Sequence, residues 1–466
     1  MRKPLKLLLS VIEVFASIVA ALPILESTQV PYCYMAVLSI IQLVLSVSIV
    51  LFGEKNKMVC IPMIFLVFSW VFHCGQIVVI GLHLNGVVYL DFRNYSTGSS
   101  QALAFVFYLI AQSLIVFGSC CFNKKTRVKK EAFFATPVNK RMSLTLMAIG
   151  LVPRLYYDSI YLFYSWNNSY GGTAVVYIPQ IINTLAFFAD AAAIMLLFVL
   201  AKEKASKGLF WFVVVILYKG LTMLSGMRKE AFVFLLLWVI IYLFVINKTS
   251  LFGFVVGLIV MYIVVALIMS IGNVRTSTSK TFETYTEEFV SQLSGGFIAD
   301  LLGESGSAFT TLAKTVNDTG SVVSFGFGKS YLAGLLTSIP LLLSFVPTLS
   351  GSTTYIMQFD NVSAFGGSYL GEFYYNYCWL GLVLAFLLGV FLSKINSVVN
   401  GYKKRKTLDL RLLIAICITI LLLMFVRGYF SGMVQKMVWL IAALFMLKPM
   451  ANHVSDASQK RFAVIR

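Results

Sequence analysis

Long apolar segments alternate with short polar connections along the whole chain. A helix needs about 20 apolar residues to cross the hydrocarbon core of a bilayer. Segments that approach this length predict twelve transmembrane helices: Leu5–Leu25, Tyr32–Phe52, Met58–Ile80, Gln101–Phe122, Met142–Tyr164, Val175–Leu200, Leu209–Leu224, Ala231–Ile246, Leu251–Ile271, Gly371–Leu392, Leu412–Val426 and Met433–Leu447. The pattern therefore predicts an all-α polytopic membrane protein, with residues 1–466 forming one membrane-embedded domain.

Composition and charge agree with this prediction. Of the 466 residues, 59% are hydrophobic and only 12% are charged, about half the charged share of a soluble protein. The net charge of +18 does not indicate a nucleic-acid partner, because cytoplasmic loops of membrane proteins are enriched in Lys and Arg. Placing the N-terminus in the cytoplasm puts the basic clusters at 2–6, 124–141 and 394–411 on the inner side. Both termini are then cytoplasmic.

The same topology leaves one long connection, residues 272–370, on the outer side. It contains the amphipathic stretch Glu287–Leu312 and the apolar run Tyr331–Phe345, which Pro340 interrupts. That run is too short and broken for a confident membrane span. It predicts a re-entrant or interfacial helix on the outer face.

Several cations fall on the outer side, against the general charge distribution. They are Arg154, Lys219, Arg228, Lys229, Arg275, Arg427 and Lys436. A charge in hydrocarbon costs roughly 2.5–3.5 kcal/mol, so such a residue usually faces the protein interior or a wet cavity. For a single such cation, a structural ion pair is explanation enough. Arg154, for example, can pair with Asp158, which lies four residues further along the same helix. As a group, these cations predict a cavity that attracts an anion, and guanidinium groups favour phosphate.

Aromatic and acidic side chains occur on the same side. Tyr157, Tyr161, Tyr369 and Tyr374 belong either to an interfacial aromatic belt or to a surface that stacks on sugar rings. Glu372, at the start of the tenth predicted helix, either stabilises the helix N-terminus or orients and deprotonates a hydroxyl nucleophile. The chain has only three His residues and no HExxH, Cys/His cluster or GxxxxGK[ST] motif. We therefore expect no metal site and no cofactor.

Three stretches resemble motifs of one family. They are Ser225-Gly-Met-Arg-Lys-Glu230, the segment from Gly326 to Pro340, and Gly367-Ser-Tyr-Leu-Gly-Glu-Phe-Tyr-Tyr-Asn-Tyr-Cys-Trp-Leu-Gly381. With the helix count and the large outer loop, they resemble the Wzy-type O-antigen or oligosaccharide repeat-unit polymerases of bacterial surface polysaccharide synthesis. An Arg-x10-Gly pattern proposed for some members is absent here, since Val239 and Thr286 occupy the glycine positions after Arg228 and Arg275.

The resemblance implies a fold similar to the multi-helical membrane glycosyltransferases and a metal-independent polymerase of the bacterial cytoplasmic (inner) membrane. The substrate would be a polyprenyl-diphosphate-linked oligosaccharide, with membrane lipid, a chain-length regulator and a flippase as further partners. By this resemblance, the catalytic residues would be Arg228, Arg275 and Glu372. The diphosphate would be bound by Arg154, Lys219, Lys229, Arg427 and Lys436, and the sugars by Tyr157, Tyr161, Tyr369 and Tyr374.

Three other functions remain open from the sequence. A lipid-linked oligosaccharide flippase or other secondary transporter also has about twelve helices, although its connections are usually short. The related O-antigen ligase is expected to use a histidine in its outer loop, and residues 272–370 contain none. A membrane protein without catalysis would leave the outer cations unexplained.

Overall fold

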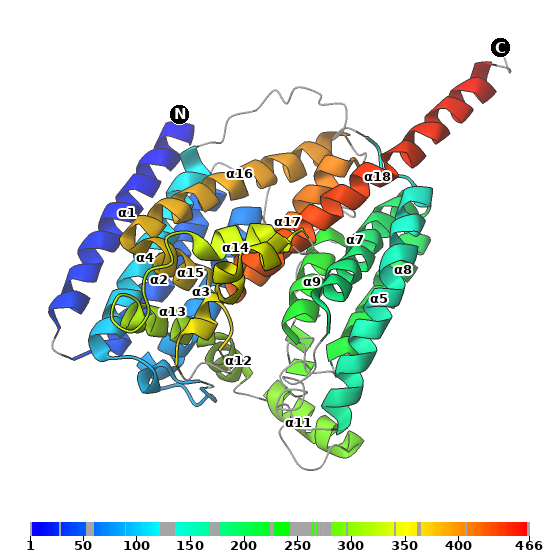
Figure 1. Ribbon diagram of the computed structural model, residues 1–466. Coiled ribbons are helices and arrows are strands. Elements are labelled where there is room, and N and C mark those ends of the chain that lie inside the picture. The colour runs from blue at the N-terminus through cyan, green and yellow to red at the C-terminus, as the bar shows by residue number, and fades with distance from the viewer. Residues whose placement is uncertain are drawn as a thin grey trace. The chain divides into compact units, whose positions relative to one another are not determined.

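In the computed structural model, the regular elements of the described residues are helices, with two isolated β-bridges besides (Figure 1). It describes residues 2–27, 29–52, 60–88, 90–121, 136–167, 178–223, 228–242, 262–263, 266–267, 270, 274, 281–294, 297–339, 342–360, 365–405 and 408–463. Contacts divide the chain into two compact units. Unit 1 comprises 1–125, 296–397 and 421–435, and unit 2 comprises 126–295, 398–420 and 436–466. Each unit is described by itself.

Unit 1 begins with four long helices, and the later helices of the chain pack against them. Its elements are α1 (Arg2–Glu26), α2 (Tyr32–Leu51), α3 (Ile61–Gly81), η1 (Phe92–Asn94), α4 (Gly98–Cys121), α12 (Phe297–Ser305), α13 (Ser307–Asp318), α14 (Lys329–Thr337), η3 (Leu342–Phe345), η4 (Pro347–Ser352), η5 (Tyr355–Gln358), α15 (Tyr369–Tyr377), η6 (Cys378–Leu380) and most of α16 (Gly381–Arg405).

Unit 2 contains α5 (Lys140–Asn167), α7 (Gln180–Glu203), α8 (Ala205–Met223), α9 (Arg228–Ile240) and α11 (Phe282–Ser294). The helices α17 (Leu410–Val426) and α18 (Phe430–Ala463) each contribute to both units. The backbones of α5 and α7 approach each other closely at Gly150. A Cβ atom at that position would lie only 2.3 Å from the Ala189 nitrogen, so no larger residue fits there. Small residues allow this spacing, which is typical of helix packing in membranes.

Eight described helical segments are long and apolar enough to cross a membrane. They fall in α1, α2, α3, α4, α7, α8, the α15–α16 region and α18, and α17 is a shorter apolar helix. The chain is thus a helical, multi-pass membrane protein. The predicted spans Met142–Tyr164 and Ala231–Ile246 correspond to α5 and to a region that includes part of α9, which are not among the eight. Leu251–Ile271 lies mainly outside the described residues. These three spans stay predictions.

The tenth predicted helix, Gly371–Leu392, is not continuous. It is divided into α15 and α16 by η6, where Cys378 has a φ of 50°. A positive φ is costly for a residue other than glycine, and it interrupts the helical path. The apolar residues on both sides of the break conceal it in the hydropathy pattern.

The large connection folds into short helices. The apolar run Tyr331–Phe345 contains most of α14 and, at its end, the short helix η3. α14 has nine residues and rises about 13.5 Å, too little to cross a bilayer. Elsewhere the connection packs on the segment between α3 and α4. The Val87 amide donates to Asp300 at 2.8 Å, and the Thr97 amide donates to Asn317 at 3.1 Å. The two connections therefore lie on the same side, as the predicted topology requires; which side of the membrane this is stays a prediction.

We expect Gly389→Ala to destabilise the protein by about 1–3 kcal/mol. A Cβ on Gly389 would lie 2.1 Å from the Ile115 carbonyl oxygen, so α4 and α16 would have to separate. Thermal unfolding of the detergent-purified protein measures the effect. Gly432→Ala is the matched control, because a Cβ there has no heavy atom within 4 Å. Equal unfolding temperatures for the two variants would contradict the close packing.

Candidate active site

The carboxylate of Glu372 is the centre of a buried polar cluster in unit 1. Ser330 of α14 donates to Oε1 at 2.7 Å, and the Phe430 amide at the start of α18 donates to Oε2 at 3.0 Å. Asn376, one turn further along α15, donates to the Ser330 hydroxyl at 2.8 Å. Glu372, Ser330 and Asn376 are all fully buried. In this structure Glu372 therefore joins three helices, and both of its oxygens are occupied.

Two of the stretches that resemble the polymerase family are hydrogen-bonded to each other. The Gly326 amide donates to the Tyr375 carbonyl at 2.9 Å, and the Gly328 amide donates to the Asn376 side-chain oxygen at 2.9 Å. Gly328 has a φ of 85°, which glycine adopts without steric cost. A Cβ on Gly326 would lie 2.4 Å from the Tyr375 ring. The outer connection is thereby fixed to the C-terminal end of α15.

The start of α15 is held by residues of α3 and α4. Ser368 accepts from the Gly371 amide at 3.1 Å and lies 2.9 Å from His73 Nε2. The Tyr369 hydroxyl lies 2.9 Å from Ser69 Oγ and accepts from Gln112 at 3.0 Å. Tyr369, predicted to bind sugar, is fully buried here and presents no open ring face. Tyr374, predicted for the same role, is also buried, with its ring edge-to-face with Phe107.

Arg427 is the predicted diphosphate ligand that lies in unit 1. It is partly exposed, and its Nε lies 3.0 Å from where a Gly366 Cβ would be, so the turn after α17 packs closely on the segment before α15. Burial and the charge of Glu372 raise the pKa of the neighbouring Tyr429 above its ordinary value, while Arg427 opposes this shift. Arg427 thus supplies positive charge beside the Glu372 cluster.

A second polar cluster lies in unit 2, among α5, α7 and α8. Arg154 Nε lies 2.8 Å from Asp158 Oδ2, as its i,i+4 spacing suggested, and Arg154 NH1 lies 3.5 Å from Asp190 Oδ2. Lys219 lies 2.6 Å from Asp190 Oδ1, and Tyr218 donates to Asp158 at 2.5 Å. These two cations and two carboxylates balance in charge. The side chains of Lys219 and Arg154 are only 3% and 6% exposed.

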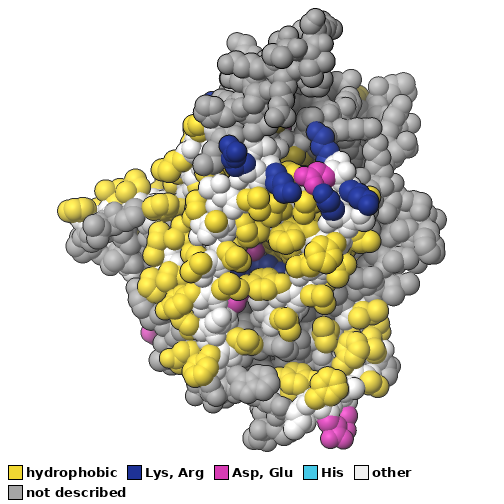
Figure 2. Space-filling model, turned by 90° about the vertical axis from the view of Figure 1, so that its right-hand side faces the viewer, with side chains coloured by type: hydrophobic (Ala, Val, Ile, Leu, Met, Phe, Trp, Pro, Cys, Tyr) yellow, Lys and Arg dark blue, Asp and Glu magenta, His cyan; other side chains and the backbone are white. Residues whose placement is uncertain are grey.

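Apolar and aromatic side chains surround this charge cluster. Arg154 lies over the Tyr157 ring at 5.7 Å, Lys219 lies over the Phe234 ring at 4.6 Å, and the rings of Tyr157 and Tyr161 are 4.9 Å apart. Figure 2 shows the side of the molecule on which α5 and α8 lie. It is largely hydrophobic, with a small group of basic and acidic side chains in its middle and more basic side chains along its upper edge.

The other predicted site residues are placed less completely. Arg228 and Lys229 form the start of α9, but their side chains, like the whole of Arg275, lie outside the described residues. Lys436 is buried in the first turns of α18. The structure therefore brings Arg154, Lys219, Tyr157 and Tyr161 together in unit 2. Glu372, Tyr369, Tyr374 and Arg427 lie in unit 1.

The sequence interpretation did not single out Ser330, Asn376 and Gln112 as functional candidates. Each is a polar residue within an apolar or aromatic segment, and this sequence pattern could have identified all three. The structure shows that they are buried. In the described ranges, no group of three His, Cys, Asp or Glu side chains is close enough to hold a metal ion.

The apolar spans, the buried ion pairs and the folded outer connection define a helical, multi-pass membrane protein with polar chemistry inside its helix bundles. The chain belongs to the family described as O-antigen polysaccharide polymerase Wzy, whose family model matches residues 7–448. This membership supports a role as an O-antigen polymerase. No curated protein and no solved structure gives a significant match.

We expect Glu372→Gln to destabilise the protein by about 1–3 kcal/mol. Ser330 and the Phe430 amide both donate to the carboxylate, whereas the amide NH₂ of Gln would face one of these donors. Thermal unfolding of the purified protein measures the loss. Asp360→Asn, at an exposed carboxylate of the same connection, is the control. An unchanged unfolding temperature for Glu372→Gln would show that the carboxylate does not hold the helices together.

Proposed function

We propose that the chain polymerises polyprenyl-diphosphate-linked oligosaccharide repeat units on the outer face of the bacterial cytoplasmic membrane. The proposal includes twelve spans, cytoplasmic termini and a fold like that of the multi-helical membrane glycosyltransferases. The family match over residues 7–448 is the observation that carries it.

The proposed reaction transfers the growing glycan between two lipid-linked substrates. The bond between the anomeric carbon and the diphosphate oxygen breaks, and a bond to a sugar hydroxyl of the incoming repeat unit forms. The proton of the hydroxyl passes to solvent water, and polyprenyl diphosphate leaves with the bonding electrons. Because negative charge grows on the leaving diphosphate, fixed cations can supply much of the transition-state stabilisation.

We assign that stabilisation to outer cations. Arg228 and Arg275 are proposed to neutralise the leaving group, with Lys229, Arg427 and Lys436 as further diphosphate ligands. The partial exposure of Arg427 and its position before α18 support its part in this set. Tyr157 and Tyr161 are the proposed sugar contacts. Glu372 acts as a positioning residue, because its hydrogen bonds fix α14, α15 and the start of α18.

We expect Arg228→Ala and Arg427→Ala each to lower polymer formation by about 10²-fold, since each removes a cation from the leaving group. The measurement is the length of the lipid-linked glycan in producing cells at matched protein levels. Single repeat units should accumulate on the outer face. Arg141→Ala, an exposed cation at the predicted cytoplasmic end of α5, is the control and should leave the glycan unchanged.

Other outcomes of that measurement would contradict the proposal. Accumulation of single units on the cytoplasmic side on loss of the protein would identify a flippase. Full-length lipid-linked polymer that is not passed to its final acceptor would identify a ligase. Normal polymer in both arginine variants would overturn the assignment of these two cations.

Arg154 and Lys219 require a separate test, because their carboxylate partners already balance their charge. We expect Lys219→Met alone to destabilise by about 3–5 kcal/mol, since it leaves Asp190 with weaker compensation in a buried site. The double variant Lys219→Met with Asp190→Asn should recover much of this loss. Unfolding temperature and polymer length measured on the same preparations separate the two roles. If Lys219 holds diphosphate, the double variant stays inactive although it is folded, and full activity would exclude that role.

A further inference from the structure

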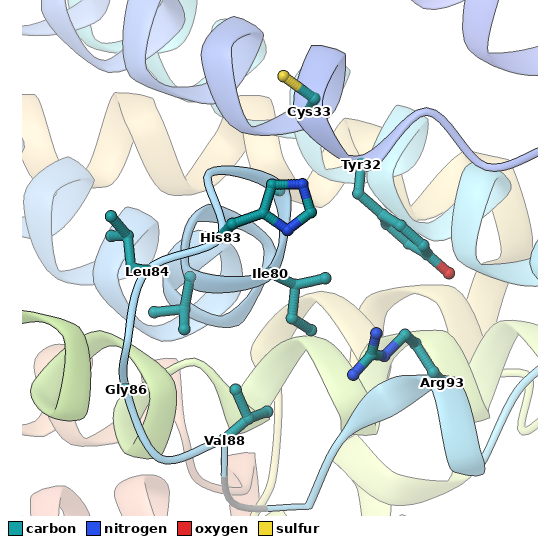
Figure 3. A pocket seen from close by; sticks show the side chains of 10 residues that line it. Tyr32, Cys33, Ile80, His83, Leu84, Gly86, Val88 and Arg93 are labelled. Atoms are coloured by element: carbon teal, nitrogen blue, oxygen red, sulfur yellow. The ribbon is translucent and has the colours of Figure 1, made fainter.

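Unit 1 contains a pocket of about 540 Å³ that lies apart from the Glu372 cluster. It is an open pocket bordered by the start of α2, the end of α3 and the segment that leads into η1 (Figure 3). Its lining residues are Tyr32, Cys33, Val79, Ile80, Gly81, His83, Leu84, Gly86, Val88 and Arg93. The volume is within the range of about 300–1,000 Å³ typical of small-molecule sites.

The position of the pocket follows from the ends of two candidate spans. One span begins at Tyr32 and another ends at Gly81, so the pocket lies at a membrane interface. The pocket segment also packs on the large connection, since a Cβ on Gly86 would lie 2.7 Å from the Ala299 carbonyl carbon. In the proposed topology this is the outer side, where the polysaccharide grows.

The lining combines an aromatic ring with two nitrogen-bearing side chains. In Figure 3, Tyr32, His83 and Arg93 come from three different segments around Ile80. The Tyr32 ring is held edge-to-face with Phe92 at 5.8 Å, and its hydroxyl donates to Gln101 at 2.5 Å. A fixed aromatic face suits the C–H face of a sugar.

The two nitrogen-bearing side chains are both accessible, and that of Arg93 is also held in place. Arg93 is held by Asp91, with Nε 2.9 Å from Oδ2, yet 48% of its side chain is exposed. His83 is exposed and has a φ of 51°. Positive φ is uncommon for residues other than glycine, and such strain tends to persist at functional sites. Together these groups can donate hydrogen bonds to hydroxyl or acidic substituents of a glycan.

We propose that this pocket is a second glycan-binding site, separate from the Glu372 cluster, which holds the growing polysaccharide. This inference rests on the proposed polymerase function. Retention of the polymer keeps its reactive end at high effective concentration, so that more repeat units are added before the chain is released. The pocket thus controls the length of the product rather than the chemistry of a single transfer.

Cys33 provides a direct test of occupancy, because it is an exposed thiol in the lining. The probes are fragments of one to ten repeat units, released by mild acid from the polysaccharide of the producing cells. The full chain in lipid nanodiscs is treated with a maleimide, and mass spectrometry follows the labelling of Cys33. We expect the fragments to slow this labelling, with longer fragments acting at lower concentration.

The variants are His83→Gly and Arg93→Ala, with Asn94→Ala as the matched control. Glycine suits the positive φ at position 83, so His83→Gly removes the imidazole without backbone strain. Asn94 is the exposed neighbour of Arg93 and does not line the pocket. Each of the two pocket variants should raise the fragment concentration needed for protection by about tenfold. In cells, both should still consume single repeat units but produce shorter polymers.

Two results would overturn the glycan site. One is that fragments leave the labelling of Cys33 unchanged in the wild-type protein. The other is that His83→Gly retains full protection and normal polymer length. Failure of the proposed polymerase function would give a different observation: the wild-type chain would not convert single repeat units into polymer. Protection of Cys33 would still decide whether the pocket binds glycan.

Discussion

Satisfying one buried carboxylate holds several segments of unit 1 together. Glu372 accepts from Ser330 and from the first amide of α18, so three segments meet at one side chain. Leaving a buried carboxylate without these donors would cost the full desolvation penalty of its charge. The backbone pairing of Gly326 with Tyr375 and the capping of α15 by Ser368 extend the same network. The segment of the large connection from Gly326 to Ser330 is therefore part of the scaffold of unit 1.

The same constraint acts in unit 2, where charges from three helices compensate one another. Arg154 and Lys219 share Asp190, and Asp158 completes the balance. A neutral cluster is tolerated in an apolar bundle far better than an isolated cation. A diphosphate could engage these cations only by competing with carboxylates at 2.6–3.5 Å. Arg427, in unit 1, is partly exposed, unlike the buried residues Arg154 and Lys219.

The parts of the structure that depend on local sequence were predictable, and those that depend on distant contacts were not. Hydropathy located most of the long helices, and i,i+4 spacing suggested the Arg154–Asp158 pair. The partners of Glu372 are 42 and 58 residues away, so no local pattern reveals them. The division of α15 from α16 was missed because Cys378, Trp379 and Leu380 continue the apolar run. Tyr369 was predicted to face sugar because composition cannot distinguish an interfacial tyrosine from a buried one.

These networks also determine what mutagenesis can reveal about catalysis. The two motif stretches of unit 1 hold each other through backbone and side-chain hydrogen bonds, so replacing Ser330 or Asn376 would disturb the fold around any reacting group. Loss of activity in such a variant is therefore no sign of a catalytic residue. Only changes that keep the network satisfied separate chemistry from positioning, either paired substitutions that preserve charge balance or substitutions of partly exposed cations. By this criterion Lys219 is informative only when it is replaced together with Asp190.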